Sequence, residues 1–80
     1  MPFYFYLWDG ENERHLAEHG ISQEEFEEIV CAPDEIVQSR SSGRPAAVGF
    51  TSTGRYLICV FEMLDEVTVY PITGYEVEEI

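Results

Sequence analysis

The sequence has 80 residues, which is enough for one folded domain but not for two separate cores, because chains this short bury only about 60% of their unfolded surface. Hydrophobic residues make up 45% of the chain and aromatic residues 14%, which supplies a packed core and argues against intrinsic disorder. Four arginines, no lysine and 16 carboxylates give a net charge of −12, so bulk attraction to the phosphates of nucleic acid is excluded. We therefore expect a single domain spanning residues 1–80.

The aromatic run at residues 3–8 has high β propensity and predicts a strand. It is too short for a membrane span and lacks the basic flank of a signal peptide, so we expect neither. Without an export signal, Cys31 and Cys59 are expected to be free thiols in a reducing compartment rather than a disulfide. The prediction is a cytoplasmic protein with no membrane contact.

Two helices are predicted next. The first covers residues 11–18, with Asp9 as its N-terminal cap and Gly20 as its left-handed stop. The second begins after Ser22, because Ser22 and Glu25 form a capping box, and it ends near Cys31 before Pro33. Helical spacing places four residues of the first helix on its inward stripe: Asn12, His15, Leu16 and His19.

The second half of the chain has the pattern of four β-strands, at residues 36–38, 46–51, 56–62 and 67–73. The turn at residues 52–54 predicts a hairpin, and the strand after it is apolar on both faces, which is typical of a central strand covered by helices. Pro71 removes a ladder donor, so residues 67–72 are expected at an edge or a strand end, where a second chain could pair to form a homodimer. The predicted fold class is α+β, in the order β-α-α-β-β-β-β, with both helices packed on a small antiparallel sheet.

A few residues could carry chemistry. His15 and His19 have the i, i+4 spacing of a helical zinc pair, but a zinc site needs a third ligand from a distant element, so we expect no metal and no other cofactor. Tyr70 and Tyr75 could transfer a proton or stack on a base, or they could simply cover the sheet. Residues 36–61 contain no carboxylate and hold three arginines, Arg40, Arg44 and Arg55, so an anion would be attracted most strongly there.

Short motifs extend over nearly the whole chain: Trp8-Asp9, His15, His19-Gly20-Ile21-Ser22 with Glu25, and residues 70–76. In these motifs the chain resembles the BrnT family of small bacterial toxins. It implies a RelE-like fold, with two helices against a small antiparallel sheet. It also implies a toxin of a type II toxin–antitoxin system whose active members cleave RNA without a metal, and a DNA-binding antitoxin as partner.

Three cationic positions of the family pattern are replaced in this sequence. Glu18 stands before His19 where the family has lysine, a second family lysine falls near Glu11, and Thr73-Gly74-Tyr75 replaces a Ser-Ala-Arg run. Metal-independent RNA cleavage needs a base, an acid and cations that stabilise the phosphorane. The remaining candidates are Arg40, Arg44 and Arg55 for binding RNA, and His15, His19, Arg55, Tyr70 and Tyr75 for catalysis.

Two hypotheses follow. In the first, the chain is an endoribonuclease toxin in which Arg55 contacts phosphate. In the second, the same fold is catalytically inactive and binds a basic protein, such as an antitoxin segment, through the acidic face of the second helix; its carboxylates are Glu24, Glu25, Glu27 and Glu28. The alternative role of Arg55 is an ion pair with Glu62 or Glu66.

Overall fold

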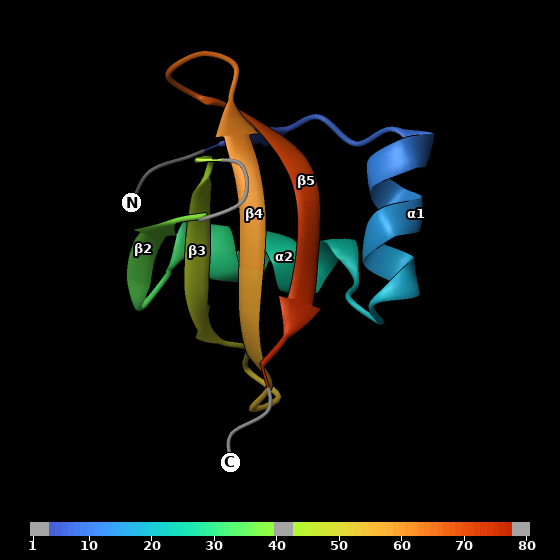
Figure 1. Cartoon of the computed structure of the whole chain (residues 1–80), viewed down its shortest axis with the longest axis vertical. Coiled ribbons are helices and arrows are strands. Elements are labelled where there is room, and N and C mark those ends of the chain that lie inside the picture. Colours follow the sequence, from blue (N-terminus) through green and yellow to red (C-terminus); the bar gives the residue numbers. More distant parts are fainter. Residues whose placement is uncertain (1–3, 40–42, 78–80) are drawn as a thin grey trace.

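The computed structural model, which describes residues 4–39 and 43–77, has two helices packed against a five-stranded sheet (Figure 1). The predicted α+β class and element order are confirmed. No helix in the described ranges is long and apolar enough to cross a membrane. The elements are β1 (Phe5–Tyr6), α1 (Gly10–Glu18), α2 (Gln23–Cys31), β2 (Glu35–Gln38), β3 (Pro45–Phe50), β4 (Tyr56–Met63) and β5 (Thr68–Glu76).

Both helices begin at the predicted caps. The Asp9 carboxylate accepts hydrogen bonds from the backbone N–H groups of Glu11 and Asn12, and Ser22 forms the expected capping box with Glu25. Gly20 has a φ of +72° after the end of α1, a conformation that side chains other than glycine adopt only at a cost. Local sequence therefore sets both helix starts and the turn between the helices.

The sheet has the order β1-β5-β4-β3-β2, with β4 in the predicted central position. Neighbouring strands from β2 to β5 are antiparallel, but β1 is parallel to β5, so the prediction of a purely antiparallel sheet is wrong. The N-terminal segment supplies the outer partner of β5, donating the Phe5 N–H to Val67 and the Leu7 N–H to Val69. Sequence pattern does not reveal this pairing because it joins the two ends of the chain.

The prediction that residues 67–72 lie at an edge or a strand end is wrong for Thr68 and Val69, which pair with β1, but no described strand pairs with the outer side of β5 at Pro71. The carbonyls of Val69 and Pro71 both point away from β4, since Val69 accepts from Leu7 and Pro71 accepts from Asn12. The nitrogen of Pro71 lies on that same side, because the N–H and C=O groups of one strand residue share a direction. Its missing N–H therefore removes no bond from the β4–β5 ladder.

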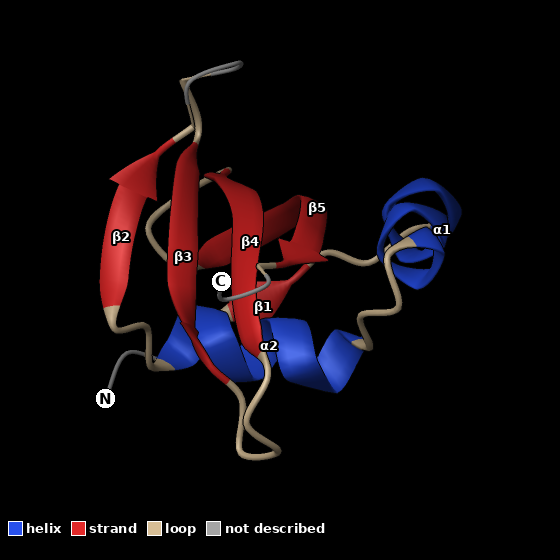
Figure 2. Cartoon of the chain, turned by 60° about the horizontal axis from the view of Figure 1, so that its bottom comes forward, coloured by secondary structure: helices blue, strands red, loops and turns tan. Residues whose placement is uncertain are grey.

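The core lies between α2 and one face of the sheet (Figure 2). Phe26 and Ile29 of α2 are fully buried against Leu57 and Cys59 of β4, and Trp8 packs edge-on against Phe26 with ring centroids 5.6 Å apart. Both cysteines are free, as predicted.

Helix α1 packs beside β5 rather than across the sheet (Figure 1). A Cβ at Gly74 would lie 3.1 Å from the Leu16 side chain, so the glycine permits this close approach. The predicted inward stripe is confirmed for Asn12 and Leu16, whereas His15 is half-buried and His19 is exposed. His19 departs from the stripe because it is the C-cap of the helix, where helical periodicity ends.

Asn12 joins three segments. Its side-chain nitrogen donates to the carbonyls of Leu7 and Pro71 at 3.0 and 3.1 Å, and its side-chain oxygen accepts from the backbone N–H of Asp9 at 2.8 Å. The residue is only 2% exposed. It therefore continues the hydrogen bonding between the N-terminal segment and β5 beyond the last residue of β1.

We expect Asn12→Ala to lower the free energy of unfolding by about 2 to 3 kcal/mol, because it leaves buried carbonyls without a donor. Urea denaturation followed by circular dichroism measures this. The control is Glu18→Ala on the exposed side of α1, which should change the same free energy by less than about 0.5 kcal/mol. Equal stabilities of the two variants would contradict the role assigned to Asn12.

Candidate functional site

The residues predicted to act together lie in separate places. His15 and Tyr70 line one pocket between α1 and β5, whereas Arg55 lies at the start of β4 near the α1–α2 turn. Tyr75 is exposed on the sheet, and His19 is exposed at the end of α1. Arg40 lies outside the described residues. The structure therefore brings His15 together with Tyr70 and separates both from Arg55.

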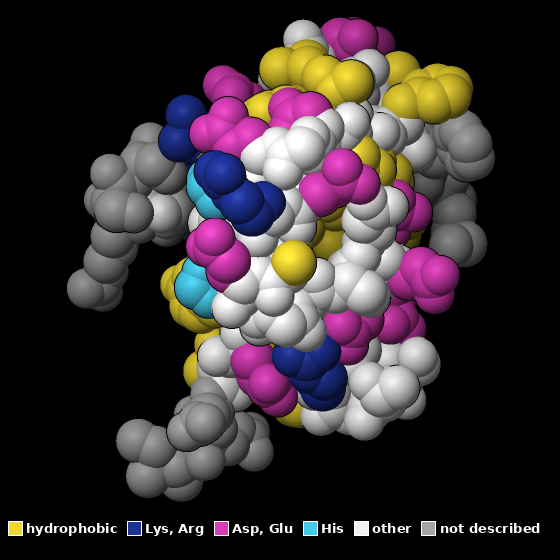
Figure 3. All heavy atoms as spheres, turned by 90° about the vertical axis from the view of Figure 1, so that its right-hand side faces the viewer, with side chains coloured by type: hydrophobic (Ala, Val, Ile, Leu, Met, Phe, Trp, Pro, Cys, Tyr) yellow, Lys and Arg dark blue, Asp and Glu magenta, His cyan; other side chains and the backbone are white. Residues whose placement is uncertain are grey.

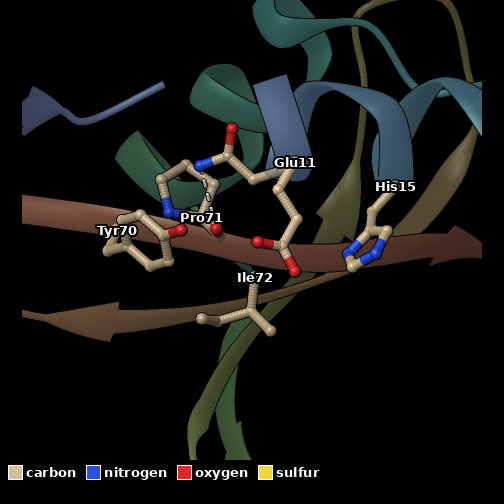
Figure 4. Close-up of a pocket in the computed structure, with 6 residues that line it drawn as sticks. Glu11, His15, Tyr70, Pro71 and Ile72 are labelled. Atoms are coloured by element: carbon tan, nitrogen blue, oxygen red, sulfur yellow. Dashed lines mark hydrogen bonds between the residues drawn. The ribbon is translucent and has the colours of Figure 1, made fainter. Parts of the chain in front are cut away.

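The pocket between α1 and β5 has a volume of about 100 Å³. Figure 4 shows the carboxylate of Glu11 between the ring of Tyr70 and the imidazole of His15, with Ile72 beneath them. Glu11 and His15 project from α1, while Tyr70 and Ile72 come from β5. The position of α1 beside β5 thus creates this group of polar side chains.

Tyr70 is held by a strong hydrogen bond. Its hydroxyl donates to Oδ2 of Asp9 at 2.7 Å, and this bond raises the pKa of the phenol. The pKa of Asp9 is lowered, first by the hydrogen bond from the backbone N–H of Asn12 and then by that from Tyr70. At neutral pH, Tyr70 is therefore a protonated donor already bound to a carboxylate, which makes it a weak acid for catalysis.

The pocket has proton-carrying groups but lacks the cations that phosphate chemistry needs. Its lining combines an imidazole, a phenol and a carboxylate, and none of the described residues that line it is an arginine. Asp9 and Glu11 add negative charge at the place where a phosphorane would develop its own. The electrostatics of the pocket favour a positively charged group over an RNA phosphate.

Arg55 is bound within the molecule. Its Nη1 donates to both carboxylate oxygens of Glu25 at 2.8 Å and to the carbonyl of Gly20 at 3.0 Å, while its Nη2 donates to Glu76 at 3.2 Å. The guanidinium thus joins the α1–α2 turn, helix α2 and strand β5. The alternative prediction that Arg55 forms an ion pair is confirmed, but its partners are Glu25 and Glu76 rather than Glu62 or Glu66.

Glu25 has two structural roles. Burial raises the pKa of its carboxyl, but the hydrogen bond with the Ser22 backbone and those from Arg55 outweigh this effect and lower the pKa below its ordinary value of 4.5. Glu25 therefore stays ionised at neutral pH, capping α2 and binding the guanidinium of Arg55 at the same time.

The other described arginine of the carboxylate-free segment also has an acidic neighbour. Arg44 lies 3.9 Å from Glu62, and both side chains are largely exposed. On the face that includes α1, carboxylates and basic side chains lie interspersed (Figure 3). The segment at residues 36–61 is therefore not an open cationic surface in its described part.

Two carboxylates on the acidic face of α2 accept hydrogen bonds from other parts of the chain. Glu27 accepts from the Trp8 indole N–H at 2.9 Å, and Glu28 accepts from the Ser52 backbone N–H at 3.0 Å. Glu24 and Glu28 remain exposed beside a hollow of about 430 Å³ near the β3–β4 turn.

Sequence reasoning missed Glu76 and the Gly20 carbonyl as partners of Arg55, and Asp9 as the partner of Tyr70. The available signal was the capping box, which already fixed the position of the Glu25 side chain at the start of α2. The pairing with Glu76 has no local signal because β4 and β5 bring these residues together only in the folded sheet.

We expect Arg55→Met to lower the free energy of unfolding by about 1 to 2 kcal/mol at about pH 7, because Glu25 and Glu76 lose their shared cation. The pKa of the Glu25 carboxyl is lower in the folded protein than in the unfolded chain. Its contribution to stability is therefore fully present above the unfolded-state pKa and is lost as the pH falls through the folded-state pKa. The difference from the parent protein should therefore shrink below about pH 4.5, as urea denaturation at about pH 7 and about pH 3.5 would measure.

The matched control is Arg44→Met, which removes one positive charge from an exposed ion pair in which Nε of Arg44 lies 3.9 Å from Oε2 of Glu62. It should lower the free energy of unfolding by less than about 0.5 kcal/mol. A loss of stability in Arg55→Met that is the same at both pH values would contradict the proposed ionic contribution.

Comparison of the chain with protein-family models, with curated proteins and with solved structures finds no match. The resemblance to BrnT toxins therefore stays a prediction, and the functional argument depends on the residues and contacts described above.

Proposed function

We propose that this chain is an acidic protein-interaction module that binds a basic polypeptide. The observation that carries the proposal is the position of Arg55, the strongest phosphate-binding candidate in the sequence, which is bound by two carboxylates and a carbonyl of its own chain. With Arg44 also beside a carboxylate, the net charge of −12 is expressed at the surface mainly by carboxylates. Such a surface attracts cationic partners and repels nucleic acid.

The class of partner follows from this charge. A lysine-rich or arginine-rich segment would meet the exposed carboxylates of Glu24 and Glu28 or those near the α1–β5 pocket. A basic DNA-binding antitoxin, as the BrnT resemblance implies, belongs to that class, and membership of that toxin family with its RelE-like fold is part of the proposal. Two free thiols are compatible with the proposed cytoplasmic location.

The test is binding of a fluorescent peptide of about ten residues that alternates valine and lysine, measured by anisotropy at low salt and at rising salt. We expect saturable binding that weakens as the salt concentration rises, because surface charges are screened. The control peptide replaces each lysine with glutamate and should not bind. Absence of binding by the lysine peptide at low salt would contradict the proposed function.

RNA cleavage is a second candidate, favoured by the meeting of His15, Glu11 and Tyr70 in one pocket. If this pocket were catalytic, His15→Ala and Tyr70→Phe would each reduce cleavage, whereas His19→Ala on the exposed helix end would not. We expect none of these proteins to cleave a labelled messenger RNA, with or without ribosomes, because the pocket supplies no described cation. RNA cleavage by the parent protein that is lost in His15→Ala and retained in His19→Ala would favour the toxin hypothesis instead.

A further inference from the structure

Strand β2 is an open edge of the sheet. Among the described strands it pairs with β3 alone, and all four of its residues are exposed, including Ile36 at 52% and Val37 at 37%. Ser39 donates its backbone N–H to Arg44 on the β3 side, so by strand alternation the N–H groups of Ile36 and Gln38 point to the open edge. An open edge of this kind can pair with another extended chain.

Apolar hollows flank this edge on both faces of the sheet. One, of about 310 Å³, lies on the face opposite α2 and is lined by Val37, Ala46, Ile58, Val60 and Tyr75. The other, of about 330 Å³, is lined by Ile36, Val37 and Pro45. Successive side chains of an added strand point to opposite faces, so every second side chain could enter the hollow on one face.

The opposite end of the sheet offers less for such pairing. Strand β1 has only two residues, and the outer side of β5 beyond it is occupied by Asn12 and α1. The exposed apolar residues there, Phe5 and Leu7, therefore border a much shorter edge. Of the two edges in the described sheet, β2 is the better template for an additional strand.

The charged residues near β2 indicate which kind of chain could pair with this edge. Asp34 and Glu35 are exposed at the start of β2, and Glu35 shares the face of Val37. A second copy of the chain would bring a second net charge of −12 close to the first, and this overall repulsion would oppose dimerisation. An extended segment that carries lysine or arginine between apolar residues would instead place its apolar side chains in the hollow on one face and its basic side chains on the other face, near the carboxylates.

We propose that the open edge of β2, with the apolar hollows on its two sides, binds an extended basic segment of another protein as a sixth strand. This inference rests on the proposed function, whose partner class it shares, and it adds the binding site and the conformation of the bound segment. Backbone hydrogen bonds supply affinity without sequence preference, whereas the hollows select apolar side chains at alternate positions.

The test uses the valine–lysine peptide with two variants of the full chain. Ile36→Lys places a cation in the proposed site, and Leu64→Lys makes the same charge change in the β4–β5 turn at a residue that is also 52% exposed. We expect Ile36→Lys to weaken peptide binding about tenfold and Leu64→Lys by no more than about twofold. Thermal denaturation checks that both variants stay folded.

Amide resonances measured by NMR locate the bound peptide. We expect the largest shifts, and added protection from hydrogen exchange, at Ile36 and Gln38. Equal binding by both lysine variants, or shifts confined to α2, to the α1–β5 pocket or to β1, would overturn the β2 site while leaving the proposed function standing. A dimer of the protein that Ile36→Lys disrupts would overturn the choice of occupant, and failure of the parent protein to bind the peptide would overturn both proposals.

Discussion

The contact of Arg55 with three parts of the chain is the ionic interaction that joins the helices to the sheet in this acidic fold. Its guanidinium holds the end of the α1–α2 turn through Gly20, the first turn of α2 through Glu25 and the end of β5 through Glu76. Without this cation, two carboxylates would face each other where helix and sheet meet, in a protein that already has 12 excess negative charges. The same contacts that stabilise this junction also occupy donors of Arg55 that a phosphate contact would need, so this interaction bears on both the stability of the molecule and its proposed function.

Other acidic side chains follow the same principle, because they accept hydrogen bonds from groups of the same chain. Asp9 caps α1 and accepts the Tyr70 hydroxyl, Glu27 accepts the Trp8 indole N–H, and Glu28 accepts a backbone N–H of the β3–β4 turn. What these contacts leave for a partner is an acidic surface together with an exposed apolar strand edge. That combination suits a basic and partly apolar segment better than it suits RNA.

The arrangement at Pro71 shows how a local rule can hold while the conclusion drawn from it holds only in part. A proline in a strand does need a position where its missing N–H is not required. Pro71 meets that need inside the sheet, because its nitrogen faces the point where β1 has ended and the side chain of Asn12 takes over. The sequence pattern showed that Pro71 needs a position without a ladder hydrogen bond at its nitrogen, and it suggested an edge or a strand end. It did not indicate that the buried side chain of Asn12 would continue the hydrogen bonding of β5 there.

The sequence by itself determined the α+β class, the element order, the caps at Asp9 and Ser22 and the central place of β4, because these follow from local hydrogen bonding and short-range hydrophobic periodicity. It also identified Asn12 and Leu16 as inward residues, since helical spacing fixes which side chains share a face. Only the tertiary structure decided the parallel pairing of β1 with β5, the grouping of His15 with Tyr70 and Glu11, and the partners of Arg55. Those contacts join residues 21 to 63 positions apart, and their geometry depends on how the twisted sheet and the two helices pack. No periodicity within a short window contains that information.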